Sequence, residues 1–400
     1  MGIVISAEHA FAFCCWVLAV AWLLKGGEAL RGMRRLRDLC ANPDGLAAIP
    51  ESEIPDLTVV VPARDEEAAI GACLRSLLAS AGVRLQIIAV DDRSTDETGH
   101  RMDAIAAEVR SPDCRNYLEV IHIKVLPLGW LGKPHALALA AKRARASWIL
   151  FTDGDILFAP RALELAVRGA KTTGADHLVL VPTLILESAG ERAVLAAMQS
   201  LALWAVRLWK VADPRARDFI GAGGFNMIRS EVYTQVGGFE ALRMEILEDL
   251  YLGKRVKDAG FAQRIVVGRD LVRVRWIDGP LAVIRLVEKN GFAVTRFRTG
   301  LHLLACLAFV IHALVPLIAI ACGGWTAVAG LLTYLGIALA YQANLRACGV
   351  SGRYAFTFAP ATLLVAYSFF RSMVLALVRK GVMWRGTHYS LDELRRAARE

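Results

Sequence analysis

Two kinds of hydrophobic pattern divide this chain. Long, nearly unbroken apolar runs lie toward its two ends, and short β-branched runs separated by polar or glycine-containing segments lie between them. The long runs cover residues 10–24, 301–321, 326–340 and 355–378. A helix that crosses a bilayer needs about 17–20 apolar residues, so each run is a candidate, although the first is short and Pro360 and Arg371 interrupt the fourth.

The central region predicts an α/β fold with a mostly parallel sheet and helices on both faces. Its strands are expected at 57–61, 86–90, 119–125, 148–152 and 178–182. Between the first two, Ile70, Leu74, Leu77 and Leu78 recur on one face of a helix, with Asp65 as its candidate N-cap. Alternating strands and helices favour parallel pairing. The segment 42–56 contains three prolines and reads as a linker.

The flanks of the first apolar run indicate an anchor that is not cleaved. No cation precedes it, and it is followed by Lys25, Arg31, Arg34, Arg35 and Arg37. A secretory signal has the opposite charge order and a small-residue cleavage site. The positive-inside rule then places the central region in the cytosol, with the N-terminus outside. A buried core helix is the alternative for this run.

The fourth run conflicts with the same rule. If the first three runs cross, a fourth crossing would export a basic tail that contains Arg379, Lys380, Arg385, Arg395, Arg396 and Arg399. Arg371 would also lie inside the bilayer, where a charge is costly. We therefore predict that 355–378 is re-entrant or interfacial and that the tail is cytosolic. The basic amphipathic stretch 279–300 is expected either at the headgroup interface or as an ordinary surface helix.

Composition supports membrane attachment. The chain is 56% hydrophobic with a mean hydropathy of +0.43, which is too apolar for a soluble enzyme of this size. Its formal charge of +9 gathers beside apolar runs and in the tail, so anionic lipid headgroups are expected as partners and nucleic acid is not. The eight cysteines lack paired metal-ligand spacing and are read as reduced, small apolar residues.

Carboxylates follow three of the predicted strands. Asp65 and Glu66 follow the first, Asp91 and Asp92 the second, and the pair Asp153 and Asp155 follows 148–152. Ligands of open parallel sheets bind outside the carboxyl ends of the strands, so these acids are expected at one edge. Asp-Gly-Asp carboxylates suit Mg²⁺ or Mn²⁺ that bridges phosphate oxygens, although the motif is also common in simple turns.

Two further motifs have a functional and a plain structural interpretation. Asp92 is expected to contact a nucleotide, whereas a helix N-cap box would explain Ser94, Thr95 and Glu97. Lys133 precedes a helix expected at 136–144, where an ammonium and free N–H groups suit phosphate, or it is an ordinary solvated lysine. His135 is expected to pack locally.

A candidate base stands apart from these acids. Glu248 and Asp249 open a predicted helix in which Leu250, Leu252 and Val256 face the core, and the two acids either complement the helix dipole or supply chemistry. Transfer to a hydroxyl with inversion needs one general base, for which Asp249 is the best placed. The glycine-rich segment 221–226 allows a substrate to approach the backbone closely.

Together these motifs resemble glycosyltransferase family 2. The matching strings, in the family's order over roughly 57–260, are Val-Val-Val-Pro-Ala-Arg-Asp65-Glu, Ala-Val-Asp91-Asp92-Arg-Ser-Thr-Asp, Gly132-Lys133, Asp153-Gly-Asp155, Gly-Ala-Gly-Gly-Phe-Asn and Glu248-Asp249. The resemblance implies an A-type glycosyltransferase (nucleotide-diphospho-sugar transferase) fold, a UDP-sugar, a divalent metal and inversion. It also implies that Asp65 and Asp92 hold the nucleotide, Asp155 the metal, and that Asp249 is the base.

Within that family the chain resembles hopene-associated glycosyltransferases, with carotenoid and ceramide glucosyltransferases as relatives. The strings are Leu-Pro-Leu-Gly-Trp-Leu-Gly-Lys, Val-Glu-Lys289-Asn290 and Trp384-Arg385-Gly386-Thr-His-Tyr389. One departure concerns the Gln/Arg-x-x-Arg-Trp motif of many relatives. Here Val272-Arg-Val-Arg275-Trp276 lacks its first residue, so Arg275 and Trp276 receive no role, and a processive polysaccharide synthase becomes a weaker interpretation.

The expected organisation is an anchor and basic linker in 1–50, a catalytic domain in 51–278, and an interfacial helix, membrane helices and basic tail in 279–400. The site residues are assigned as catalytic (Asp249, Glu248), donor-binding (Pro62, Arg64, Asp65, Glu66, Asp91, Asp92, Lys133, Asp153), metal-binding (Asp155, Asp153) and acceptor-region (Gly223, Gly224, Phe225, Asn226, Trp384, Arg385).

The expected function is sugar transfer from a UDP-sugar to a membrane lipid, a hopanoid or other polyisoprenoid alcohol, by an integral protein of the cytoplasmic membrane whose catalytic domain is cytosolic. Three alternatives stay open. They are transfer to a polyprenyl phosphate, a catalytically inactive membrane scaffold, and a nucleotidyltransferase built on a similar parallel sheet.

Overall fold

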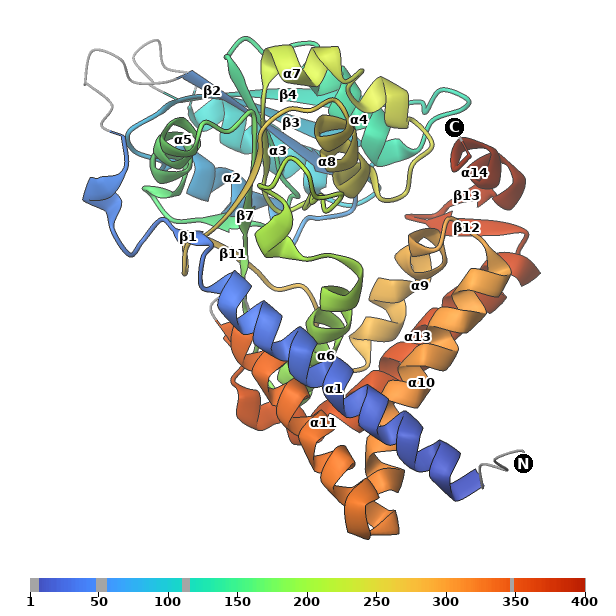
Figure 1. Cartoon of the computed structure of the whole chain (residues 1–400). Coiled ribbons are helices and arrows are strands. Elements are labelled where there is room, and N and C mark those ends of the chain that lie inside the picture. Colours follow the sequence, from blue (N-terminus) through green and yellow to red (C-terminus); the bar gives the residue numbers. More distant parts are fainter. Residues whose placement is uncertain (1–6, 48–55, 110–115, 346–348, 400) are drawn as a thin grey trace. The chain divides into compact units, whose positions relative to one another are not determined.

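The computed structural model describes residues 7–47, 56–109, 116–345 and 349–399, which form two compact units (Figure 1). The sheet unit comprises Leu36–Ile185, Lys210–Trp276 and the chain from Met383 onward. The helical unit comprises the chain up to Arg35, Leu186–Trp209 and Ile277–Val382. These boundaries differ from the three consecutive segments expected from the sequence, because the chain passes between the units several times.

The sheet unit is built on an eight-stranded, mostly parallel sheet, as predicted. Its strand order is β1-β10-β7-β9-β5-β2-β3-β4. The strands are β1 (Arg37–Asp38), β2 (Asp56–Ala63), β3 (Arg84–Asp92), β4 (Tyr117–Ile123), β5 (Trp148–Phe151), β7 (His177–Val181), β9 (Asn226–Arg229) and β10 (Gln263–Val267). Only β9 runs antiparallel to its described neighbours, β5 and β7. The five predicted strands are confirmed as β2, β3, β4, β5 and β7.

Alternating side chains give the sheet two buried faces. In β2, Val59 and Val61 belong to one hydrophobic core, whereas Val60 belongs to the other, because successive strand residues point to opposite faces. The first core includes residues of α2 (Ile70–Leu78), α3 (Thr98–Glu108) and α5 (Ala162–Thr173). The second includes residues of α4 (Gly132–Ala141), α7 (Ser230–Gln235) and α8 (Glu248–Asp258). Helices therefore cover both faces, as expected.

Smaller elements complete the sheet unit. A three-stranded sheet has the order β6-β11-β8, from Leu157–Phe158, Val272–Val274 and Thr183–Leu184. Near the C-terminus, β12 (Gly381–Trp384) and β13 (Thr387–Ser390) form a two-stranded sheet that leads into α14 (Leu391–Ala397). The segment 42–56 contains a short 3₁₀ helix, η1 (Pro43–Gly45), capped by Asn42, and its residues 48–55 lie outside the described residues.

Two predicted helix caps are wrong. The N-cap position of α2 is Ala69, and Asp65 instead lies in the loop after β2 with a positive φ of 52°. The N-cap position of α3 is Glu97, whose side chain makes no capping hydrogen bond, so the predicted box around Ser94 and Thr95 does not form. Asp65 Oδ1 instead accepts the Thr95 N–H at 2.8 Å, and the Glu97 N–H donates to Glu67 Oε2 at 3.1 Å, so both residues bond to a neighbouring loop.

The helical unit contains four helices that are long and apolar enough to span a membrane, judged by length and composition among the described residues. They are Ala7–Met33, Thr299–Cys322, Gly324–Ala343 and Gly352–Val378. The first three correspond to α1, α10 and α11, and the fourth to the 3₁₀ turn η5 (Gly352–Thr357) followed by α13 (Phe358–Val378). The expected apolar runs are thus all helical. The re-entrant or interfacial placement of the fourth stays a prediction.

Small residues let two of these helices approach closely. A Cβ placed on Gly26 of α1 would lie 2.3 Å from the Gly336 carbonyl oxygen of α11, and one on Gly336 would lie 2.5 Å from the Trp22 backbone. Such glycine contacts are typical of helices that pack in membranes.

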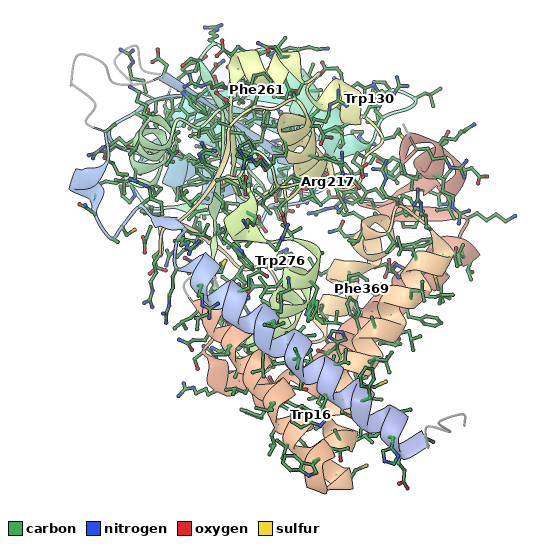
Figure 2. All side chains as sticks on the ribbon, in the orientation of Figure 1. Trp16, Trp130, Arg217, Phe261, Trp276 and Phe369 are labelled. Carbon is green, nitrogen blue, oxygen red and sulfur yellow. The ribbon has the colours of Figure 1, made fainter. Side chains whose placement is uncertain are left out.

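Figure 2 labels Trp16 on α1 and Phe369 on α13. Six cysteines of the described residues are free, which agrees with the predicted reduced state.

The helical unit also holds a compact ion network. Arg371 of α13 contacts Glu288 at 2.6 Å, and Arg379 contacts the other oxygen of Glu288 at 2.7 Å. Glu288 lies on α9 (Ala282–Val294), which occupies most of the predicted amphipathic stretch, and Ser372 accepts the Phe292 N–H at 3.0 Å. The helix expected in 279–300 therefore forms, and it supplies the counter-charge for the arginine inside the fourth apolar run. A capping box at Ser188 and Glu191 begins α6 (Ala189–Ala205).

Candidate active site

The ends of three adjacent parallel strands bring the predicted acids to one edge of the sheet. Strand β2 lies between β5 and β3, with Val60 opposite Phe151 and Ala63 opposite Asp91. Strand β9 begins at this edge because it runs antiparallel to β5, with Asn226 opposite Phe151. The glycine-rich segment before β9 therefore meets the segment after β5, and the Asp153 N–H donates to the Gly223 carbonyl at 3.0 Å.

Lys133 links the acids that follow β5 to those that begin α8. Its ammonium lies 2.6 Å from Asp153 Oδ1 and 2.8 Å from Glu248 Oε1. Burial opposes the charged form, but the charges of Asp153, Glu248 and Asp249 raise the pKa of Lys133 well above its ordinary value. Lys133 lies in the first turn of α4, which begins four residues before the predicted start. The phosphate-binding role assigned to it stays a prediction.

The glycines make room for the protein's own site groups. A Cβ on Gly223 would lie 2.5 Å from Asp153 Oδ2 and 3.2 Å from Lys133 Nζ, and one on Gly221 would lie 1.8 Å from the Asp249 carbonyl oxygen. Close approach of a substrate to this backbone was the sequence-based interpretation. The structure shows instead that glycine is needed so that Asp153, Lys133 and the start of α8 can pack together.

Asp155 has the features of a cation ligand. Its Oδ1 atom is buried without a hydrogen-bond partner among the described residues. Burial, followed by the charges of Asp153 and Glu66, raises its pKa to about 7. A carboxylate that is crowded by like charges and poorly hydrogen-bonded is stabilised by a divalent cation with oxygen ligands. Within the described residues, no group of three or more His, Cys, Asp or Glu side chains could hold a metal ion by itself.

Asp249 lies in the first turn of α8, and hydrogen bonds fix both its side chain and its backbone carbonyl. Its Oδ1 accepts the Leu250 N–H at 2.7 Å, and its backbone carbonyl accepts a hydrogen bond from the Asn226 side chain at 3.3 Å. Burial, followed by the charge of Glu248, raises the pKa of Asp249 to about 6. A carboxylate with such a pKa is ionised at neutral pH yet is more basic than a solvent-exposed aspartate.

Two residues assigned to the acceptor region are buried. Phe225 is 0% exposed in the hydrophobic core, and Asn226 is 1% exposed. The Asn226 side-chain oxygen Oδ1 contacts His177 Nε2, and Gln263 Nε2 contacts His177 Nδ1 at 2.8 Å. Neither the Phe225 nor the Asn226 side chain is exposed, and their assignment to the acceptor region stays a prediction. Asn226 connects a buried polar network to the backbone of Asp249, a role that neither its spacing nor its neighbours in the sequence indicated.

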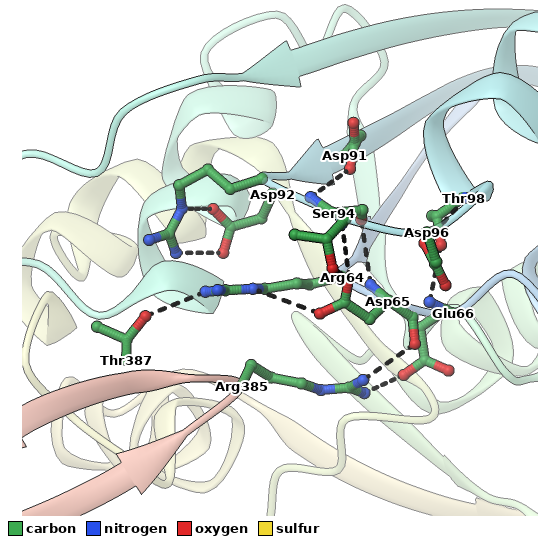
Figure 3. A network of polar contacts seen from close by, with 12 residues as sticks. Arg64, Asp65, Glu66, Asp91, Asp92, Ser94, Asp96, Thr98, Arg385 and Thr387 are labelled. Atoms are coloured by element: carbon green, nitrogen blue, oxygen red, sulfur yellow. Dashed lines mark hydrogen bonds and ion pairs between the residues drawn. The ribbon is translucent and has the colours of Figure 1, made fainter.

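The loops after β2 and β3 are bonded to each other (Figure 3). The Asp65 N–H donates to Ser94 Oγ at 3.1 Å, and Asp65 Oδ1 accepts the Thr95 N–H at 2.8 Å. The Glu66 N–H donates to Thr98 Oγ1 at 2.8 Å. Asp65 therefore shapes this pair of loops, and its predicted contact with a nucleotide stays a prediction. Pro62 lies within β2 and is buried, and its assignment to donor binding stays a prediction.

The two aspartates at the end of β3 have different surroundings. Asp91 accepts the Ser94 N–H at 3.1 Å and contacts His122 at 3.0 Å, so it organises the turn. Asp92 forms a bidentate pair with Arg93 at 2.7 and 3.0 Å. Sequence reasoning did not single out Arg93, whose φ of 59° is unusual for a residue with a side chain. His135 packs edge-on against Trp130 with ring centroids 5.4 Å apart, as predicted.

The C-terminal residues assigned to the acceptor region have their contacts elsewhere. Arg385 donates to the Asp65 carbonyl at 3.2 Å and pairs with Glu66, in the loop predicted to bind the donor. Trp384 lies beside Tyr389, with ring centroids 6.5 Å apart. Arg275 and Trp276 follow β11, and Trp276 is 44% exposed. The acceptor-region residues therefore do not gather into one group.

Comparison with known proteins agrees with this geometry. Residues 58–251 match the family model described as glycosyl transferase family 2. The 4,4'-diaponeurosporenoate glycosyltransferase of Staphylococcus aureus strain USA300 is 24% identical over 220 residues, which cover 55% of this chain and 56% of that protein. Its counterpart in bovine strain RF122 is 25% identical over 198 residues, covering 49% and 50%. This chain thus spans about half the length of the curated relatives it matches.

A solved structure shares the fold over a larger part of the chain. The mannosyltransferase PcManGT from Pyrobaculum calidifontis, in complex with GDP-Man and Mn²⁺, superposes with a TM-score of 0.54 and 20% identity, covering 92% of this chain and 99% of that one. At this identity the likeness shows the fold alone, which is the predicted A-type glycosyltransferase fold. Residues 58–251 of this chain are therefore similar to glycosyl transferase family 2, and the sheet unit has the A-type fold.

Proposed function

We propose that this chain is an inverting glycosyltransferase that moves a sugar from a UDP-sugar to a polyisoprenoid lipid acceptor, such as a hopanoid alcohol, at the cytosolic face of the cytoplasmic membrane. The observation that carries the proposal is the cluster that Lys133 forms with Asp153 and Glu248, beside Asp155 and Asp249, at the carboxyl edge of a family 2 domain. Lys133, Asp153 and Glu248 come from three separate segments of the chain, whereas a purely structural turn would need only one segment.

The chemistry assigned to Asp249 is proton acceptance. As the acceptor hydroxyl oxygen forms a bond to the anomeric carbon, the bond from that carbon to the donor diphosphate breaks with its electron pair on the diphosphate. The hydroxyl proton passes to the Asp249 carboxylate. Attack from the face opposite the leaving group inverts the anomeric centre. The pKa of about 6 keeps Asp249 ionised at neutral pH, as this step requires.

The acids also fit a bound Mg²⁺ or Mn²⁺. Asp155 is the better ligand, because one of its oxygens is buried without a partner, whereas Asp153 is already paired with Lys133. When bound, such a cation neutralises charge on the departing diphosphate. Lys133 would hold Asp153 in place and reduce the repulsion between Asp153 and Glu248. Because the described residues offer few further carboxylates, donor phosphate oxygens and water would complete the coordination.

The helical unit supports a lipid acceptor and membrane attachment. It carries four candidate membrane spans, and the similar Staphylococcus aureus proteins are named for transfer to diaponeurosporenoate. We assign α9 to the headgroup region, because Arg285 and the exposed Leu281 lie at its start while Val283 and Val287 are buried. A lipid hydroxyl at that level would not have to leave the bilayer to react.

The course of the chain supports a cytosolic tail. Residues Lys210–Trp276 and the chain from Met383 onward belong to the same compact unit, so both lie on one side of the membrane. An even number of crossings must then separate them, whereas three candidate spans lie between. This supports our assignment of 355–378 as a re-entrant or interfacial segment that does not cross the bilayer. The five cations that follow the apolar run 10–24 favour the cytosol for this side.

The test is transfer of labelled sugar into lipid. Membranes that contain the full chain would receive UDP-sugars, with GDP-sugars as a second arm, plus Mn²⁺ or chelator, and the organic extract would be counted. Asp249→Asn is compared with Asp258→Asn, a matched change of an exposed acid on the same helix. Lipid label that requires Asp249 but not Asp258 supports the proposal.

Other outcomes identify the alternatives. An acid-labile product indicates a polyprenyl phosphate acceptor, and a lipid that carries the nucleotide indicates a nucleotidyltransferase. Absence of lipid label with every donor, from protein that is folded and present in the membrane, would overturn the proposal and favour an inactive scaffold.

A further inference from the structure

The C-terminal hairpin ends in a turn with an unusual residue. Strand β12 ends at Trp384 and β13 begins at Thr387, so the connection is the dipeptide Arg385-Gly386. Both residues have positive φ, 47° and 73°. Two positive values in a two-residue hairpin are typical of a type I′ turn, which favours Asn, Asp or Gly at its first position. An arginine there is held against its backbone preference, which points to a use for its side chain.

The turn contacts the loop that follows β2 (Figure 3). One Arg385 nitrogen donates to the Asp65 carbonyl at 3.2 Å and the other pairs with the Glu66 carboxylate. Next to it, Thr387 Oγ1 accepts a hydrogen bond from Arg64 at 3.2 Å. Consecutive residues of the loop, which separate β2 from α2, are therefore fixed by side chains more than three hundred positions away in the sequence.

A second anchor of the hairpin lies at the start of α4. The Tyr389 hydroxyl accepts the Gly132 N–H at 3.2 Å and also interacts with Arg93, the partner of Asp92. Tyr389 is 6% exposed, so it is built into the sheet unit. The hairpin thus contacts the segments after β2, after β3 and at the start of α4. These segments contain Glu66, Asp92 and Lys133.

The charge of Arg385 matters because of its surroundings. Glu66 lies close enough to Asp155 for their negative charges to interact. Arg385 compensates Glu66 and holds it in the hairpin contact, while Lys133 compensates Asp153 on the other side of Asp155. The acids nearest to Asp155 are in this way each paired with a cation, and Asp155 keeps a buried oxygen without a partner.

We propose that Arg385 is a positioning residue of the donor site: it fixes the Arg64–Glu66 loop through Glu66 and the Asp65 backbone. This inference rests on the proposed function, because it takes these loops to hold the donor nucleotide. The chain must therefore return from the helical unit to complete its own donor site. Arg385 acts on the donor's affinity, whereas Asp249 acts on the chemical step.

The experiment measures UDP binding and transfer kinetics with the purified full-length protein. We expect Arg385→Ala to weaken UDP binding and to raise the donor KM by about tenfold, the size expected when a charge-assisted contact is lost. The kcat at saturating donor and the acceptor KM should change less than about twofold, and Arg385→Lys should fall between the two. Arg396→Ala is the matched control, because it removes the same charge from the exposed side of α14 in the same tail.

A double-mutant cycle tests the mechanism. Because Arg385 acts through Glu66 as well as through the Asp65 backbone, Arg385→Ala should have a smaller effect in a Glu66→Gln background than in the wild type. An equal loss in both backgrounds would overturn the positioning role, as would wild-type UDP affinity in folded Arg385→Ala protein. A general loss of thermal stability that Arg385→Lys does not reverse also counts against it. Wild-type protein that binds neither UDP nor GDP would overturn the proposed function, and this inference with it.

Discussion

The charged clusters of the two units differ in how completely their members are paired with groups of opposite charge. In the helical unit, the carboxylate of Glu288 contacts two arginines, Arg371 and Arg379, through separate oxygens. In the sheet unit, the acids around Lys133 exceed the positive charge that reaches them, and burial raises the pKa of Asp155 to about 7 and that of Asp249 to about 6. In the helical unit each charged group of this cluster contacts a group of opposite sign, whereas the sheet edge gathers more acids than the cation beside them can pair with.

This difference separates a structural charge from one that is available for binding or chemistry. A pair that is fully satisfied inside the protein has little left to offer a ligand, whereas crowded carboxylates are stabilised when a cation or proton arrives. The contacts of Arg371 with Glu288 therefore fit a packing role. For the sheet unit, we expect a metal ion or the proton of an acceptor hydroxyl to relieve the crowding of the acids.

The largest effect should follow from changing the acid assigned as base. Asp249→Asn keeps the shape of the side chain but removes its basicity, so kcat should fall by about 10²–10⁴-fold. Measured lipid glycosylation, with Asp258→Asn as control, checks this. If the asparagine variant kept more than about a tenth of wild-type kcat, Asp249 would not be the base, and the excess charge of the sheet edge would have another purpose.

Much of the sheet unit follows from local pattern. Five strands were predictable because they are short, β-branched and bounded by turn residues, and the order of the sheet then carried their acids to one edge. Strands β1, β9 and β10 of this sheet were missed. Strand β1 has only two residues, and β9 has only four, beginning with the polar Asn226. In β10 the β-branched run Ile265–Val267 is only three residues long and follows the polar Gln263 and Arg264.

The site was less predictable than the fold, because its finer contacts join distant segments. The placement of Asp153 and Asp155 at the edge that also holds Asp91 and Asp92 could be expected from the strand ends. The pairing of Lys133 with both Asp153 and Glu248 was not expected, because Glu248 lies ninety-five positions after Asp153. The burial of Asn226 could not, since it depends on a contact with His177, forty-nine positions away. The pairing of Arg385 with Glu66 spans 319 positions and leaves no periodic signal.

A second change tests the charge balance of the sheet edge directly. Lys133→Met leaves Asp153 and Glu248 without their shared cation, and Glu248 is only 2% exposed. We expect unfolding to become easier by about 3 kcal/mol, because a buried charge loses its partner. Lys254→Met, which breaks an exposed pair with Asp258 on α8, should change stability by less than about 0.5 kcal/mol. Denaturant unfolding of both variants measures the contrast, and equal stabilities would contradict the role given to Lys133.

A third change tests the helical unit. Glu288→Gln removes the charge shared by Arg371 and Arg379, and it should destabilise the protein by about 1–2 kcal/mol, since the network is partly exposed. Glu28→Gln, which affects a single and longer ion pair with Lys25 at 3.5 Å on α1, is the control and should have a smaller effect. Thermal unfolding in detergent compares them. Transfer kinetics at a temperature where both variants are folded should match wild type, because this network is structural.

The smallest expected effect links stability to pH through Asp249. Burial and Glu248 raise its pKa from an ordinary 3.8 to about 6, so the folded protein holds this proton more tightly than the unfolded chain does. Its contribution to stability is therefore full below about pH 4 and is lost as the pH rises to about 6. Asp249→Asn removes that loss, and with solvent screening the variant should be more stable than wild type by on the order of 1 kcal/mol at pH 7. The advantage should disappear near pH 4, with Asp258→Asn unchanged at both values. An advantage that is independent of pH would mean that repacking, rather than relief of a buried charge, stabilises the variant, and the contrast between the two units would lose one of its supports.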